Sequence, residues 1–184
     1  PNLQNPLGAL MPVARKRELV DLLARHSVPL IEDDVYGELY ADVRRPPPAK
    51  AFDRSGGVLH CASFSKCLAP GYRVGWAAAG RYAREVLRLK MMTSLATSVP
   101  PQLAIAEYLA QGNYDRHLRQ LRSALAAEQQ RARRLIERYF PAGTRVTLPA
   151  GGYFLWLEMP PGVDAVDLHH RAMGRGISTA PGVL

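Results

Sequence analysis

The segment HCASFSKCLAPGYRVGW, residues 60–76, decides the fold of this chain. An apolar run over residues 58–62 leads into it and predicts a buried β-strand. A second apolar run, residues 74–79, follows a Pro-Gly turn and predicts another buried strand. Two strands therefore flank a short loop that contains hydroxyl groups, an amine and a guanidinium.

This loop has the chemistry of a ligand site. In open α/β sheets, ligands bind in loops at the carboxyl ends of strands. Ser63, Ser65 and Arg73 suit a phosphate group, because the guanidinium fork matches phosphate oxygens. Lys66 is placed to form a Schiff base with a carbonyl group. A lone loop lysine is more often a solvated charge, but phosphate, carbonyl and lysine together suggest pyridoxal phosphate.

Two further polar clusters stand where turns and strands end. Asn5 lies in an Asn-Pro turn. Asp33 and Asp34 close an apolar run over residues 28–31, which predicts a buried strand, and Tyr36 follows them. Acids at a strand end can bind Mg²⁺ in nucleotide hydrolases, but the GxxxxGK[ST] phosphate loop is absent from the chain. Ordinary solvated acids are the other alternative.

Composition limits the possible classes of protein. With 184 residues, 47% of them hydrophobic, the chain has the size of one domain with a substantial core. No apolar run approaches membrane-spanning length. Cys61 and Cys67 match no zinc or redox spacing, which predicts reduced thiols in a cytoplasmic protein. The net charge of +8 would suit nucleic acid, but the arginines lack interleaved aromatic residues, which favours a solvated basic surface.

The remaining elements are predicted from periodicity. A helix opens at Pro12 with Leu19, Leu22 and Leu23 on its packing side. Apolar residues three and four apart between Tyr114 and Tyr139 predict one long helix, either a coiled coil or a link between two domains, and we favour the link. The other expected helices cover residues 81–98 and 100–109 and a segment capped by Asp164, and the other expected strands cover residues 145–148, 153–157 and 177–179. His169 and His170 are adjacent, which favours a surface pair over a metal site, and no metal site is predicted.

The motifs occur in the order found in fold-type I pyridoxal-phosphate enzymes, the aspartate aminotransferase superfamily. The chain resembles these enzymes in its N-P-x-G turn, D-x-x-Y strand end, S-x-S-K loop with a following arginine, long helix and GGYFLWL segment. Within the superfamily, residues 32–39 and 65–71 look most like the aminotransferase-like domains of MocR-type regulators. Those regulators are GntR-family transcription factors with an N-terminal winged helix.

The resemblance implies a role for each matching residue. Lys66 would hold the cofactor as a Schiff base and transfer the proton during catalysis. Asp33 would keep the pyridine nitrogen protonated, so that the ring accepts electrons. The remaining cofactor contacts would be Asn5 and Tyr36 at the phenolic oxygen and Ser63, Ser65 and Arg73 at the phosphate.

The resemblance also implies the architecture. It predicts an α/β fold: the C-terminal part of a transferase fold, with a mixed, mostly parallel sheet flanked by helices. Residues 1–112 would belong to the large cofactor domain, and residues 113–184 to the linking helix and an incomplete small α+β domain. The glycine-rich phosphate loop and the substrate-carboxylate arginine would lie outside the chain. A fragment of a longer, homodimeric protein is therefore expected.

The resemblance fits two functions. The first is an aminotransferase that acts on amino acids and 2-oxo acids. The second is a sensor that binds the same cofactor and contacts DNA only through an upstream winged helix. A structural domain without cofactor would leave Asp33, Lys66 and Arg73 unexplained. The resemblance implies no membrane partner, and the substrate is not specified by these residues.

Overall fold

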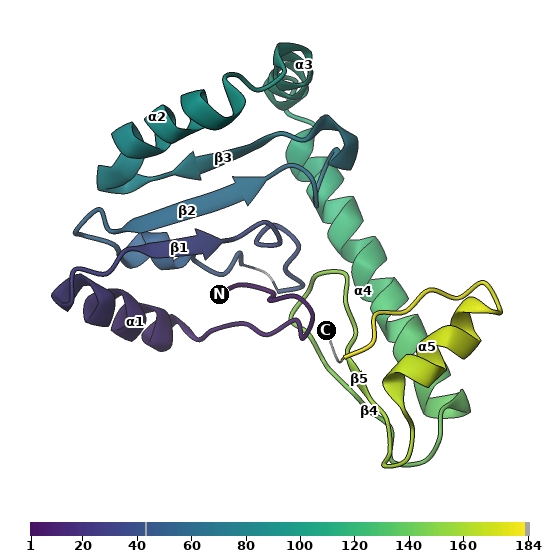
Figure 1. Ribbon diagram of the computed structural model, residues 1–184. Coiled ribbons are helices and arrows are strands. Elements are labelled where there is room, and N and C mark those ends of the chain that lie inside the picture. Colours follow the sequence, from purple (N-terminus) through teal and green to yellow (C-terminus); the bar gives the residue numbers. More distant parts are fainter. Residues whose placement is uncertain (43, 183–184) are drawn as a thin grey trace.

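A three-stranded sheet forms the centre of the computed structural model, which describes residues 1–42 and 44–182. The strands are β1 (Leu30–Asp33), β2 (Val58–Ser63) and β3 (Gly75–Ala78), in that order across the sheet. β1 and β2 are parallel, whereas β2 and β3 are antiparallel. The expected α/β class with a mixed sheet is confirmed, with one strand pair of each kind (Figure 1).

The helices follow the predicted order. The segment capped by Asp164 is helical as expected, and the Asp164 carboxylate accepts hydrogen bonds from the N–H groups of Val166 and Asp167. The α-helices are α1 (Val13–Arg25), α2 (Ala83–Ser94), α3 (Val99–Ala110), α4 (Tyr114–Tyr139) and α5 (Ala165–Met173), and the short 3₁₀ turns are η1 (Ala49–Phe52), η2 (Pro70–Tyr72) and η3 (Gly80–Tyr82).

The buried side of α1 differs from the prediction. Val20 packs with Ala49 and Val58, but the second fully buried residue of the helix is Lys16, and Leu22 is 45% exposed. The Lys16 ammonium is accommodated because it donates to Asn2 Oδ1 at 2.5 Å and to the carbonyl of Pro47 at 2.8 Å. A satisfied cation thus occupies part of the face that leucines were expected to fill.

Two strands are less buried than their composition predicted. In β1, Ile31 is 72% exposed while its neighbour Glu32 is 1% exposed. Successive side chains alternate between faces, so burying Glu32 turns Ile31 outward. All residues of β3, the last strand in the sheet order, are exposed.

The long helix is confirmed over Tyr114–Tyr139. Figure 1 shows α4 running from the sheet toward β4, β5 and α5. Leu118 on α4 is buried together with Leu3, Leu39 and Cys67, so the helix, the N-terminal segment and the loop after β2 share one core.

The C-terminal strands are shorter than predicted. The antiparallel pair consists of β4 (Arg145–Val146) and β5 (Leu157–Glu158), so most of residues 153–157 is not strand. Residues 177–179 form no strand either. The N–H of Ile177 donates to the carbonyl of Ala172 at 2.9 Å and closes the end of α5, so it is not free for strand pairing.

The expected small domain, within residues 113–184, includes residues 183–184, which lie outside the described part of the chain. The proline-rich segment between β1 and β2 contains η1. Within the described residues, no helix combines the length and the apolar character that a membrane span requires.

Candidate active site

Alternation along the paired strands brings two predicted site residues, Asp33 and Ser63, to one face of the sheet together with Cys61. Asp33 pairs with Cys61 in the register of β1 and β2, and Ser63 lies two residues further along β2. Residues paired across strands and residues two apart share a face. Asp33, Cys61 and Ser63 therefore lie on the same face, near the carboxyl ends of the parallel strands.

The neighbouring acids Asp33 and Asp34 have different surroundings. Asp33 is exposed, and its carboxylate accepts a hydrogen bond from the N–H of Val35 at 3.2 Å, but among the described residues no other side chain forms an ion pair or hydrogen bond with it. Asp34 is 2% exposed and accepts from Asn2 Nδ2 at 2.9 Å and Arg45 Nη2 at 2.8 Å. Only Asp33 is therefore available to a ligand on the open face.

The phosphate candidates lie in the loop between β2 and β3 or at its start. The N–H of Ser65 lies 3.4 Å from Ser63 Oγ, and Arg73 Nη1 donates to Ser65 Oγ at 3.4 Å and to the carbonyl of Pro70 at 3.3 Å. Arg73 has a φ of 55°, in the left-handed region, which is uncommon for a residue other than glycine. Two hydroxyls and a guanidinium at one loop provide the donor set that an anion such as phosphate requires.

Lys66 lies beside Tyr36. Its exposed side chain places Nζ 5.6 Å from the centre of the Tyr36 ring, within the range of a cation–π contact. The Tyr36 ring stands edge-on to Tyr153 and Phe154, with centroid distances of 6.5 and 5.7 Å. The structure thus brings Lys66 and Tyr36 together and adds an aromatic wall from the C-terminal part of the chain.

Among the described residues, no hydrogen bond, ion pair or ring contact joins Asn5 to the other predicted site residues. Asn5 is exposed, in a turn closed by a hydrogen bond from the N–H of Gln4 to the carbonyl of Ala9 at 2.9 Å. Gly8 of this turn lies against Pro149: a Cβ at Gly8 would be 2.3 Å from the Pro149 Cβ. The turn is therefore fixed against the segment before Gly151, and its role at the site stays a prediction.

Three residues near Lys66 were not predicted as site residues from the sequence. His117 Nε2 lies 2.8 Å from the carbonyl oxygen of Cys67, and the Tyr114 hydroxyl lies 3.2 Å from Cys67 Sγ. The Tyr153 hydroxyl donates to the carbonyl of Lys66. These contacts join residues 47 to 87 positions apart, so no local spacing in the sequence indicates them.

The thiol and the phenols around the lysine loop are held in their neutral forms. Burial raises the pKa of the Cys67 thiol and of the Tyr114 hydroxyl. Burial, together with the nearby Cys67 and Tyr36, also raises the pKa of Tyr153. On the sheet face, burial and then the charge of Asp33 raise the pKa of Cys61. Both tyrosine hydroxyls therefore remain hydrogen-bond donors at neutral pH.

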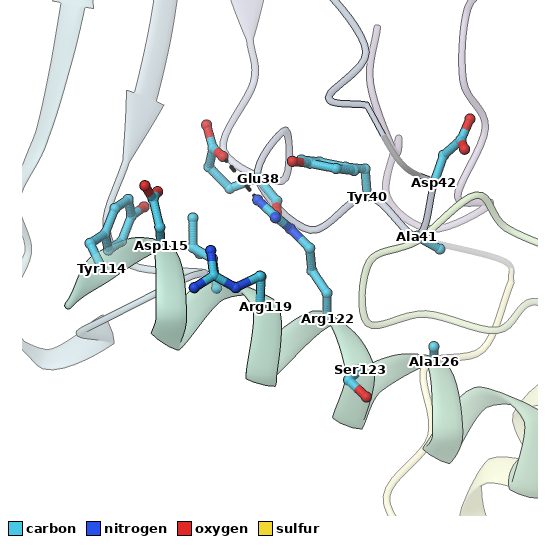
Figure 2. A pocket seen from close by; sticks show the side chains of 11 residues that line it. Glu38, Tyr40, Ala41, Asp42, Tyr114, Asp115, Arg119, Arg122, Ser123 and Ala126 are labelled. Carbon is cyan, nitrogen blue, oxygen red and sulfur yellow. Dashed lines mark hydrogen bonds and ion pairs between the residues drawn. The ribbon is translucent and has the colours of Figure 1, made fainter. Parts of the chain in front are cut away.

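A cavity of about 670 Å³ lies between α4 and the segment after Tyr36. Figure 2 shows Arg122 reaching from α4 to Glu38 and lying along the ring of Tyr40. Arg122 Nε donates to the carbonyl of Glu38 at 2.7 Å, and the guanidinium carbon lies 3.8 Å from the Tyr40 ring centre. No predicted cofactor residue lines this cavity.

The chain belongs to the aminotransferase class I and II family, whose model matches residues 1–173. Among its relatives, the uncharacterized HTH-type transcriptional regulator YdcR of Escherichia coli (strain K12) is 52% identical over 181 residues. That match covers 98% of this chain and 39% of the regulator.

Solved structures agree with this family. A kynurenine aminotransferase of Pyrococcus horikoshii, crystallised in complex with PMP, matches 99% of this chain with a TM-score of 0.90 and 32% identity. LysN, the alpha-aminoadipate aminotransferase of Thermus thermophilus, complexed with N-(5'-phosphopyridoxyl)-L-leucine, matches 99% with a TM-score of 0.89 and 31% identity. The matches cover 45% and 48% of those chains, so this chain spans less than half the length of these proteins.

Proposed function

We propose that this chain forms part of a pyridoxal-phosphate-dependent aminotransferase that acts on amino acids and 2-oxo acids. The observation that carries the proposal is the position of Asp33 and Ser63 on one sheet face, beside a loop that presents Lys66 and Arg73. The family match and the likeness to solved aminotransferases support it. The proposed cofactor contacts are Asn5, Asp33, Tyr36, Ser63, Ser65, Lys66 and Arg73, with Lys66 as the catalytic residue.

The donor set fits the chemical groups of this cofactor. A dianionic phosphate suits Ser63, Ser65 and Arg73, which hydrogen bonds through Ser65 join at one loop. A pyridine nitrogen suits Asp33, the acid at this strand end that has no side-chain partner among the described residues. An aldehyde suits the exposed amine of Lys66. When bound, the cofactor would supply an electron sink for a carbanion at the substrate Cα.

Each proposed site residue would then have a definite task. Lys66 would hold the cofactor through its amine and, with that amine free, would move the proton at the substrate Cα. Asp33 would hold a proton at the pyridine nitrogen, since a carboxylate favours the charged form of a cation beside it. Arg73, Ser63 and Ser65 would anchor the phosphate and so keep the reacting atoms positioned relative to Lys66.

A sensor function is the second candidate, and a specific observation favours it. The regulator from Escherichia coli is 52% identical to this chain, a higher identity than that of the solved aminotransferases described above. In a sensor, the same residues would capture the cofactor and an amino acid, and an upstream winged helix would contact DNA. In either case we propose a homodimer, as the resemblance to this superfamily implies.

The experiment that separates these readings uses the full-length protein. Purified protein is mixed with pyridoxal phosphate, the visible absorbance of the bound cofactor is recorded, and 2-oxo acid formation from amino acids is measured. The enzyme reading predicts steady 2-oxo acid production, whereas the sensor reading predicts cofactor binding without turnover. Lys66→Ala should abolish the absorbance change, and Lys90→Ala, an exposed lysine of α2, is the control. An unchanged spectrum in Lys66→Ala would refute both readings.

A further inference from the structure

The backbone on either side of the Lys66 side chain is held by residues remote in sequence. The carbonyl of Lys66 accepts the Tyr153 hydroxyl, and the carbonyl of Cys67 lies 2.8 Å from His117 Nε2. A carbonyl oxygen only accepts hydrogen bonds, so the His117 Nε2 must carry the hydrogen. Two consecutive carbonyls of the lysine loop are thus each bound by one distant side chain.

These side chains supply bonds that the loop itself does not make. Within the loop, the N–H groups of Leu68 and Ala69 both donate to the carbonyl of Phe64, at 2.9 and 3.0 Å. Among the described residues, the carbonyls of Lys66 and Cys67 accept no backbone N–H. Without Tyr153 and His117, each of these carbonyls would depend on solvent for a partner, and the turn would be free to reorient.

Packing around Cys67 also fixes the contact between His117 and the Cys67 carbonyl. Cys67 is 2% exposed in the core that contains Leu118 of α4, and its Sγ lies 3.2 Å from the Tyr114 hydroxyl. Phe64 stands edge-on to Tyr114 with ring centres 6.0 Å apart. The first turn of α4 and the lysine loop therefore form one packed unit, which gives the His117 contact a fixed geometry.

Tyr153 links the loop to the C-terminal part of the chain. Its hydroxyl binds the Lys66 carbonyl, while its ring stands edge-on to Tyr36, whose own ring lies 5.6 Å from Lys66 Nζ. Tyr153 follows Gly151 and Gly152, whose carbonyls accept Gln129 Nε2 of α4 at 3.4 and 2.9 Å. One residue thus contacts both the backbone of Lys66 and the ring beside its amine.

We propose that Tyr153 and His117 are positioning residues for Lys66: they hold the carbonyls of Lys66 and Cys67 and so fix the direction in which the lysine amine points. This inference rests on the proposed function of Lys66 as the cofactor anchor. Small misplacements of a reacting group lower rates strongly, so loss of either bond slows covalent capture of the cofactor by about tenfold.

The test measures the rate constant for cofactor capture by the full-length protein, from the absorbance change after mixing with pyridoxal phosphate. Tyr153→Phe removes only the hydroxyl that binds the Lys66 carbonyl, and its matched control is Tyr139→Phe, at a 68% exposed tyrosine of α4. The expected result is a rate constant about tenfold lower in Tyr153→Phe and unchanged in Tyr139→Phe, with the same thermal unfolding midpoint. The rate constant for cofactor capture should be higher in His117→Gln, which keeps a side-chain N–H, than in His117→Leu.

A second measurement does not depend on the cofactor. Amide hydrogen exchange in cofactor-free protein should be faster for the peptide over residues 64–69 in Tyr153→Phe than in the wild type, because the loop opens more often. If the wild type captures cofactor and Tyr153→Phe captures it at the same rate with the same exchange, the inference is wrong and the proposed function stands. If the wild type captures no cofactor, the proposed function and the inference fall together.

Discussion

Three consecutive acids at the end of β1 differ in burial according to the side of the strand on which they lie. Glu32 and Asp34 turn to the inner side, where each is 2% exposed or less, whereas Asp33 between them turns to the open side. All three are carboxylates within three positions of the chain, so their difference comes from the alternation of the strand. The comparison separates acids that stabilise the fold from the acid that a ligand can use.

On the inner face the carboxylate oxygens are matched by donors. Glu32 accepts the N–H groups of Ala49 and Lys50 at 2.6 and 3.0 Å, and its Oε2 lies 3.2 Å from His60 Nδ1. Asp34 binds Asn2 and Arg45. Buried polar groups require such partners, because leaving one unsatisfied costs about 1–3 kcal/mol.

On the open face the carboxylate has no matching cation. Asp33 shares this face with Cys61 and Ser63, and among the described residues no ion pair reaches it. A carboxylate without an ion-pair partner at the carboxyl end of parallel strands is available for a ligand. Substitutions of the inner acids should therefore change the stability of the fold, and substitution of Asp33 should change function.

The largest effect is expected for Glu32→Ala. This substitution leaves two buried N–H groups and the His60 ring without their acceptor, so the free energy of unfolding should fall by about 3 kcal/mol. Chemical denaturation of the full-length protein measures it. Glu18→Ala is the control, because Glu18 is exposed and forms an ion pair with the exposed Arg15, and it should change stability by less than about 0.5 kcal/mol. A loss below about 1 kcal/mol for Glu32→Ala would contradict the structural role of the inner face.

Asp33→Asn should show the opposite pattern. Loss of the charge at the pyridine nitrogen should lower turnover, or cofactor affinity in a sensor, by about 100-fold, since a well-placed electrostatic partner contributes about 3 kcal/mol. The free energy of unfolding should change by less than about 0.5 kcal/mol, because Asp33 is exposed. Kinetics and cofactor titration check the predicted loss of function, and denaturation of the same sample checks the predicted free energy of unfolding.

Asp34→Asn is the matched comparison for Asp33→Asn. It removes the charge that pairs with Arg45 and should therefore lower stability while it leaves the cofactor contacts in place. If Asp34→Asn impaired cofactor chemistry more than Asp33→Asn, the assignment of the two faces would be reversed.

A smaller, pH-dependent effect is expected at Asp53, which follows η1 and accepts the N–H groups of Gly57 and Val58 at the start of β2. Burial favours the neutral acid, but the N–H groups of Val58 and Gly57 and the Lys50 ammonium outweigh it and hold the pKa of Asp53 well below its usual range. An unfolded aspartate titrates near pH 4, so the unfolded chain binds more protons below that pH. The stabilisation is therefore present above about pH 4 and is lost as the pH falls toward the folded pKa.

The corresponding measurement compares Asp53→Asn with the wild type. At pH 7 the variant should be less stable by about 2 kcal/mol, and this difference should shrink as the pH is lowered below about 4. Asp21→Asn, at an exposed position of α1, is the control. A difference that grows toward low pH would have the wrong sign and would exclude this account of Asp53.

The comparison also explains what the sequence could predict. The apolar run at residues 58–62 and the stripe from Tyr114 to Tyr139 are local signals, and both elements are confirmed. The motif selected Asp33 over Asp34, and Asp33 is the acid on the open face. Local periodicity could not predict the burial of Lys16, because its partners, Asn2 and the Pro47 carbonyl, come from distant segments.

Short elements that depend on tertiary partners were the weakest predictions. Residues 177–179 have strand composition, but the N–H of Ile177 is used to close α5. His117 and Tyr153 contact the carbonyls of residues 50 and 87 positions away. Every residue has a backbone carbonyl, whatever its side chain, so no sequence motif could have indicated these contacts.

The central claim is that Lys66 anchors pyridoxal phosphate, and peptide mapping after borohydride reduction tests it most directly. The full-length protein is incubated with the cofactor, reduced and digested, and the added pyridoxyl mass is located. This chain has four lysines, Lys16, Lys50, Lys66 and Lys90, and the account predicts the mass on Lys66 alone. A pyridoxyl group on another lysine, or on none of them, would contradict it.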